Sequence, residues 1–169
     1  MLKPQDLVVA LKLWTGRDQS WSYPSLAGSL GMSVASVHAS VKRVVAAGFL
    51  PAGGLSARPN PESLREFLIH GARYAYPARP GEMTRGVPTA HGAEPLRNLM
   101  ARSGEPDPVW PDPEGKARGP RLDPLYPSVP RAVATDAALY EILALLDAVR
   151  AGRARERQLA IRLLQERLR

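Results

Sequence analysis

Residues 22–50 read SYPSLAGSLGMSVASVHASVKRVVAAGFL, and this stretch decides the fold expected for the chain. A short helix is predicted over 23–30, because Ser22 is a good N-cap residue and leucines recur four residues apart behind it. Gly31 follows at the position where helices commonly end in a left-handed residue. The stretch therefore opens with a short helix and a glycine turn.

A longer helix is predicted over 34–47, with Ser33 as its N-cap and Gly48 just after its end. Valines recur along it at spacings of three and four residues, which predicts a single apolar stripe facing the core. These valines are Val34, Val37, Val41 and Val44. A short helix, a glycine turn and a longer capped helix form the helix-turn-helix arrangement.

The flanking segments extend this unit to about residue 59. A helix is predicted over 4–14, because Pro4 suits a first helical position. Behind the 34–47 helix, 51–54 read Pro-Ala-Gly-Gly as a tight turn, after which Leu55–Ala57 could return as a strand. A turn and a returning strand at this place would form a small wing.

The segment 1–59 resembles the winged helix-turn-helix domains of bacterial transcriptional regulators, and MarR-type regulators are the nearest comparison. The residues that carry the resemblance are Leu26-Ala27, Leu30-Gly31-Met32-Ser33, Val37-His38, Val41, Arg43-Val44 and Ala47-Gly48-Phe49-Leu50. The resemblance implies that the longer helix enters the major groove of double-stranded DNA and that the wing adds contacts.

The helical wheel of 34–47 separates core positions from positions that could touch DNA. Ser36 and His38 lie early in the helix, where base edges are reached, whereas Lys42 and Arg43 lie later and suit phosphates. Small residues allow a close approach to the groove. The DNA-binding residues expected are Ser33, Ala35, Ser36, His38, Ala39, Lys42, Arg43 and, on the wing, Arg58.

The charge distribution agrees with a polyanionic partner. The 169 residues include 23 Lys and Arg against 16 Asp and Glu, a formal net charge of +7. The excess lies at the two ends of the chain, over 1–60 and 131–169, and the middle is neutral. Charge of this sign and placement favours nucleic acid as a partner.

The middle of the chain, 73–130, is dense in proline, which disfavours long helices and central strands. It also carries aromatic and branched aliphatic residues, which disordered linkers lack. We expect an extended, ordered wrap with one short helix near 94–101, and a flexible linker is the alternative. Ahead of it, a helix is predicted over 61–71, from the Asn60 cap to a terminating Gly71.

Two helices are predicted at the C-terminal end, over 136–151 and 153–168, with Gly152 between them. The first is apolar over a broad stripe, which requires burial on more than one side. The stripe residues are Leu139, Ile142, Leu143, Leu146 and Val149. Either the two helices complete the core within one chain, or they form the interface of a homodimer. We expect the homodimer, because helix-turn-helix regulators commonly bind two half-sites as two-fold dimers.

Other function classes receive little support. The chain has no cysteine and only three histidines, without the spacing of a metal site, and it lacks phosphate-binding and nucleophile motifs. We therefore expect no catalytic residues, no metal and no cofactor, hence no enzyme. No signal peptide and no run of 18 apolar residues are visible, which leads us to expect a cytoplasmic protein outside the membrane.

The sequence thus predicts a mainly α-helical protein in three parts. They are a winged helix-turn-helix domain over 1–72, a proline-rich extended middle segment over 73–130, and a C-terminal helical pair over 131–169. The function expected is that of a DNA-binding transcriptional regulator, specifically a dimeric repressor. Two alternatives remain: an antitoxin-like protein-interaction partner of a neighbouring toxin or defence protein, and a small-ligand sensor with its pocket around Trp110, Tyr126 and Tyr140.

Overall fold

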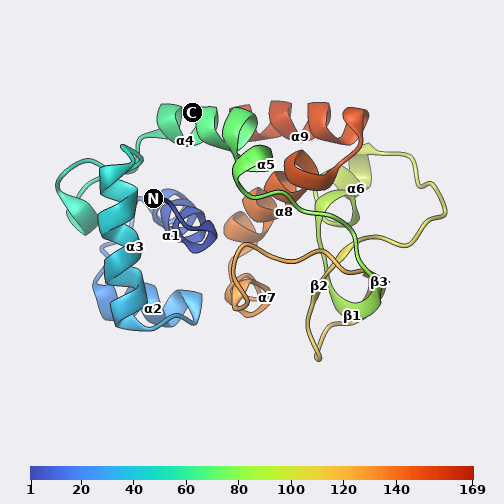
Figure 1. Ribbon diagram of the computed structural model, residues 1–169, viewed down its shortest axis with the longest axis horizontal. Helices are drawn as coiled ribbons and strands as arrows, with labels where there is room; N and C mark the ends of the chain where they lie inside the picture. Colours follow the sequence, from blue (N-terminus) through green and yellow to red (C-terminus); the bar gives the residue numbers. More distant parts are fainter.

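The computed structural model describes residues 1–169, which form a helical body with a small sheet at one end (Figure 1). The α-helices are α1 (Pro4–Thr15), α2 (Tyr23–Leu30), α3 (Val34–Ala46), α4 (Pro61–Glu66), α5 (Ala72–Ala75), α6 (Leu96–Leu99), α7 (Val129–Ala132), α8 (Ala137–Ala151) and α9 (Ala154–Arg167). The strands are β1 (Met83–Pro88), β2 (Val109–Pro111) and β3 (Ala117–Pro120). None of the helices combines the length and apolar character that a membrane-crossing segment needs.

The two predicted helices are present over 23–30 and 34–46, with the glycine turn between them and the predicted caps, and they are called the helix-turn-helix unit below. The Ser22 hydroxyl accepts a hydrogen bond from the Ser25 backbone N–H at the start of α2, and Ser33 does the same for Ser36 at the start of α3. Gly31 adopts the left-handed conformation between the helices, with φ of 62°. Polar caps and a glycine that tolerates positive φ are therefore sufficient to define this unit locally.

Two details of this unit differ from expectation. Val34, in the first turn of α3, is not part of the core stripe and is 47% exposed. The strand expected over Leu55–Ala57 is absent, and Gly54–Ser56 form a single 3-10 turn instead. The loop closes through the Asn60 N–H, which donates to the Phe49 carbonyl at 2.8 Å. The wing position is thus occupied by a loop without strands.

The helix expected to end at Gly71 continues to Ala75. A π-helical turn over Phe67–Gly71 joins α4 to α5 without a break. Gly71 has φ of −104° and sits inside this turn, so it does not act as a left-handed terminator. A Cβ at this position would lie 2.9 Å from the Phe67 ring, which indicates that close packing is the reason for the glycine.

The proline-rich middle contains a three-stranded antiparallel sheet in the order β2-β1-β3, so the expectation of no central strand is wrong. Prolines are tolerated because they stand at strand ends, as Pro88, Pro111 and Pro120 do. Inside the central strand, Gly86 allows the chains to approach. A Cβ there would lie 1.8 Å from the Trp110 carbonyl oxygen.

The middle segment is packed onto the helices, as the expectation of an ordered wrap requires. Trp110 of β2 is 1% exposed and Leu122 is 1% exposed. The short helix expected near 94–101 is present as α6. One continuous apolar cluster of 37 buried residues includes side chains from the N-terminal, middle and C-terminal parts.

The C-terminal helices α8 and α9 pack against each other as a hairpin within the chain. The other face of α8 contacts α1, α5 and the turn Ala90–Gly92, so that eight consecutive residues of α8 are buried. Leu139 and Leu146, which belong to the stripe proposed as a dimer seam, have 0% exposure. The stripe is thus covered inside one chain, which removes the reason for expecting a homodimer through it.

The buried carboxylate of Asp147 connects α8 to the sheet. Its Oδ2 accepts hydrogen bonds from Trp110 Nε1 at 2.6 Å and Thr89 Oγ1 at 2.9 Å, and its Oδ1 accepts one from Arg150 Nη1 at 2.6 Å. Arg150 Nε in turn donates to the Tyr76 carbonyl at 2.8 Å. Burial raises the pKa of the Asp147 carboxyl, and the Arg150 charge and these hydrogen bonds oppose the rise.

Asp147→Ala should destabilise the fold by about 3 kcal/mol or more, because it leaves the Trp110 N–H and the buried Arg150 guanidinium without their partner. Asp123→Ala is the matched control, since Asp123 forms an exposed ion pair with Arg121. Urea unfolding of the two variants and the parent measures the difference. Equal losses in the two variants would contradict the structural role given to Asp147.

Leu146→Glu should unfold the chain and should not yield a folded monomer, because Leu146 is buried between elements of its own chain. Circular dichroism and sedimentation velocity of parent and variant separate these outcomes. The expectation is contradicted if the parent is a dimer and Leu146→Glu is a stable, folded monomer. The stripe would then form the interface between two chains.

Candidate functional site

The helix-turn-helix unit forms one end of the molecule, and α3 stands at the end opposite the sheet (Figure 1). The inner face of α3 packs on α1 and α2. On its outer face Ala35, His38 and Lys42 are exposed and Ala39 is half-buried. Four of the predicted DNA-binding residues therefore share one accessible face.

His38 gains an aromatic neighbour that sequence reasoning missed. The Tyr23 ring, from the first turn of α2, lies with its centroid 4.8 Å from that of the His38 imidazole. Tyr23 is half-buried, so its ring supports His38 at the surface. The positions are 15 residues apart on crossing helices, and only the crossing geometry brings them together.

Ser33 and Ser36 are engaged in capping α3. The Ser33 hydroxyl donates to Ser36 Oγ at 2.8 Å and accepts from the Ser36 N–H at 3.1 Å. These hydroxyls lie at the surface at the start of the helix. They hold the helix terminus in place next to the exposed face.

Arg43 was expected to point outward, and that expectation is wrong. Its Nε and Nη2 each donate to the Asp6 carboxylate at 2.8 Å, and Asp6 has 0% exposure. The hydrogen bond to Asp6, helped by the Asp6 charge, raises the pKa of the Arg43 guanidinium. A two-pronged arginine–carboxylate pair fixes both partners in space. Arg43 thus ties α3 to the start of α1, and its guanidinium is occupied.

Arg58 lies in the loop at the wing position and forms an ion pair with Asp18 at 3.0 Å. Both side chains are more than two-thirds exposed, so this pair contributes little to stability and its partners can separate. Asp6 and Asp18 are the only acids in 1–60, and both face arginines. Helices α2 and α3 themselves contain no acidic residue.

The turn of the helix-turn-helix is held from outside by the middle segment. Ser128 Oγ donates to the Leu30 carbonyl at 2.5 Å, directly before α7. A Cβ at Gly31 would lie 3.2 Å from the Ser128 side chain. A second link joins α1 to the C-terminal part, because Lys12 Nζ lies 2.5 Å from an Asp136 carboxylate oxygen. The unit is therefore fixed to the rest of the chain.

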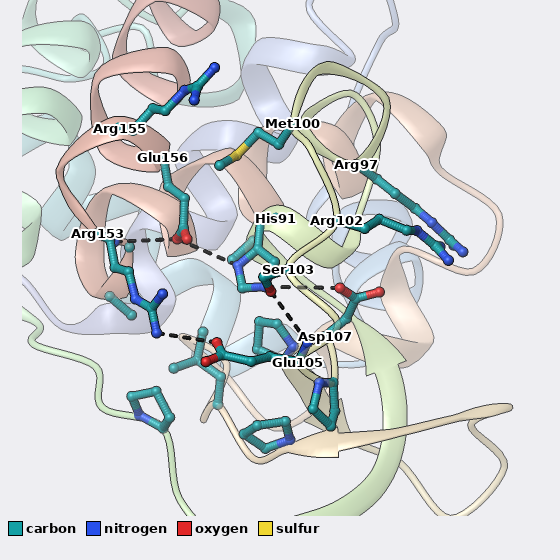
Figure 2. Close-up of a pocket in the computed structure, with 18 of the residues that line it drawn as sticks. His91, Arg97, Met100, Arg102, Ser103, Glu105, Asp107, Arg153, Arg155 and Glu156 are labelled. Carbon is teal, nitrogen blue, oxygen red and sulfur yellow. Dashed lines mark hydrogen bonds and ion pairs between the residues drawn. The ribbon is translucent and has the colours of Figure 1, made fainter.

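A second candidate site lies around His91, which the sequence alone presents as a loop residue. His91 Nδ1 lies 3.4 Å from Glu156 Oε2, and His91 Nε2 lies 3.9 Å from Asp107 Oδ1. Figure 2 shows the imidazole between these two carboxylates at the edge of a cavity. Its partners are 16 and 65 residues away in the sequence, so no local motif could have indicated the cluster.

In the alternative of a small-ligand sensor the pocket lies around Trp110, Tyr126 and Tyr140, but Trp110 and Tyr126 line neither of the two main cavities. The rings of Trp110 and Tyr140 pack with centroids 5.6 Å apart, and Trp110 fills its own space in the core. Tyr140 donates its hydroxyl to the Pro88 carbonyl at 2.6 Å. Burial raises the pKa of the Tyr140 hydroxyl. These aromatic residues have a structural role.

No group of three or more His, Asp or Glu side chains is arranged to hold a metal ion. Comparisons of the chain with models of protein families, with curated proteins and with solved structures gave no match. The candidate sites are therefore judged on their own geometry.

Arg43→Met should lower the free energy of unfolding by roughly 3 kcal/mol, because the buried Asp6 carboxylate would lose its counter-charge. Lys42→Met is the matched control at the neighbouring exposed position and should change stability little. Chemical denaturation measures both. An Arg43→Met variant as stable as Lys42→Met would mean that the guanidinium is free in solution.

Proposed function

We propose that this protein binds double-stranded DNA by placing the outer face of α3 in the major groove, and that it regulates transcription in this way. The observation that carries the proposal is the capped α2–turn–α3 unit, whose outer face is accessible and free of carboxylates. A repulsive acid near the groove would oppose binding, whereas the exposed Lys42 favours it.

The chemistry of the face suits a recognition helix. Ala35 and Ala39 are small and permit close approach to base edges, including thymine methyl groups. His38 presents imidazole nitrogens from the first half of the helix, and the Tyr23 ring supports it. Lys42 lies one turn further on, where phosphates are commonly contacted. Arg58 could exchange Asp18 for a phosphate, since its ion pair is exposed.

Arg43 has a different role in this proposal from the one expected from the sequence. It holds α3 against α1 through Asp6, so it sets the direction in which the recognition face points. A dimeric form would require a surface other than the buried α8 stripe. Repression by occlusion of a promoter needs only that the bound protein cover its site.

Lys42→Ala should weaken binding to duplexes of any sequence, because one phosphate contact is lost. The slope of log Kobs against log[salt] should fall by about one. Lys116→Ala removes the same charge from an exposed position in the β2–β3 turn and should leave binding unchanged. Fluorescence anisotropy over a salt series measures both variants. Equal losses would indicate a net-charge effect, and no loss in Lys42→Ala would contradict the proposed docking.

The variant His38→Ala tests recognition of the DNA base sequence separately from contact with the DNA phosphates. Selection from a random duplex library should yield a preferred site for the parent, and the variant should lose preference at one or two positions with its nonspecific affinity retained. If the parent enriches no site at all, the protein is not a sequence-specific regulator.

A further inference from the structure

A cavity of about 660 Å³ lies between the loop 100–108 and the corner where α8 meets α9. This volume falls within the range of cavities that hold small organic molecules. Part of its wall is apolar, and Ala90, Met100 and Leu122 contribute to it together with several prolines. The loop 100–108, which lines this cavity, lies at the end of the molecule away from α3 (Figure 1), so the cavity is separate from the proposed DNA interface.

Two of the three carboxylates of the cavity, Glu105 and Glu156, have charged or hydrogen-bonding partners, and the third, Asp107, is only near His91. Glu105 pairs with Arg153 at 3.2 Å, while Glu156 and Asp107 flank His91. Glu156 also accepts from the Arg153 backbone N–H at 3.3 Å, which completes the N-terminal cap of α9. Glu105 and Glu156 therefore link parts of the cavity wall to each other, and Asp107 is the one lining carboxylate without a hydrogen bond.

Three arginines of the lining have no such partner. Arg97, Arg102 and Arg155 line the cavity and are exposed, and none of them forms an ion pair with a carboxylate. In Figure 2 the side chains of Arg97 and Arg102 extend together in one direction, away from His91 and toward the rim of the cavity. Guanidinium groups match carboxylate and phosphate oxygens with two parallel hydrogen bonds.

The turn Ala90–Gly92 contributes Ala90 and His91 to the cavity wall, and the backbone of Ala90 has an unusual conformation. Ala90 has φ of 50°, and it is buried next to His91. Thr89 anchors the turn from below through its bond to Asp147. A non-glycine residue in this region persists only when its surroundings enforce it. The turn directs His91 toward the two carboxylates on the cavity wall.

We propose that this cavity binds a small organic carboxylate with an apolar body. Arg97 and Arg102 hold the carboxylate at the rim, and the body lies along Met100 and Leu122. The excess of unpaired guanidinium groups selects an anion over a neutral molecule. The apolar wall selects an organic acid over inorganic phosphate. The site does not depend on DNA binding.

The probes are 4-phenylbutanoate, its neutral amide 4-phenylbutanamide, and inorganic phosphate. Each is titrated into the full chain, and backbone amide shifts are followed by ¹H–¹⁵N NMR. The acid should shift amides in 90–92, 97–108 and 151–156, whereas the amide and phosphate should bind at least tenfold more weakly. The variant R97Q/R102Q should bind the acid at least tenfold more weakly than the parent.

The matched control is R118Q/R131Q, which removes two exposed arginines that form no ion pair and lie outside the cavity. It should bind the acid as the parent does. The proposal is overturned if the acid shifts no amides around the cavity, if the amide binds as well as the acid, or if the control loses as much as R97Q/R102Q. Phosphate binding equal to that of the acid would overturn the apolar part of the proposal. Because no DNA is present, these outcomes leave the proposed regulatory function untouched.

Discussion

The hydrogen bonds of one buried carboxylate, Asp147, connect the middle segment of this chain to its C-terminal helices. An ionised side chain away from water is costly unless it is paired and fully hydrogen-bonded. Here the partners come from the start of the His91 turn, from β2 and from α8 itself. Arg150 extends the network to the end of α5 through the Tyr76 carbonyl. This network ties helix α8 to β2, to the start of the His91 turn and to the end of α5.

A second ion pair, between the buried Asp6 and the partly exposed Arg43, connects two helices at the N-terminal end of the molecule. It joins the first turn of α1 to the last turns of α3, and α1 in turn packs on α8. The Ser128 contact with the Leu30 carbonyl adds a direct link from the middle segment to the turn. The helix-turn-helix unit therefore shares one core with the rest of the chain. The orientation of the outer face of α3 therefore depends on contacts from all parts of the chain.

The sequence predicted what local rules control. Caps at Ser22 and Ser33 and the left-handed Gly31 follow from hydrogen bonding and sterics within a few residues, and all three are confirmed. Periodicity predicted the inner face of α3 except at Val34, which is exposed in the first turn. The helical wheel of 34–47 also predicted which residues lie on the outer face, from Ala35 to Lys42.

Properties that depend on distant partners could not be read in this way. A helical wheel cannot show that Arg43 bends toward an aspartate 37 residues earlier, nor that Tyr23 comes to lie beside His38. The α8 stripe suggested a dimer because its covering elements, α9, α1 and the 90–92 turn, are spread over the whole chain. The His91 cluster was invisible for the same reason.

The central claim is that the outer face of α3 meets DNA, and amide mapping tests it most directly. A 20-base-pair duplex of random sequence is titrated into ¹⁵N-labelled protein at low salt, and the perturbed amides are assigned. Perturbations that gather at Tyr23 and over 33–42, and extend to the loop around Arg58, are the result that this account predicts. An unperturbed α3, with no shifts anywhere or with shifts confined to α9 and the sheet, would contradict it.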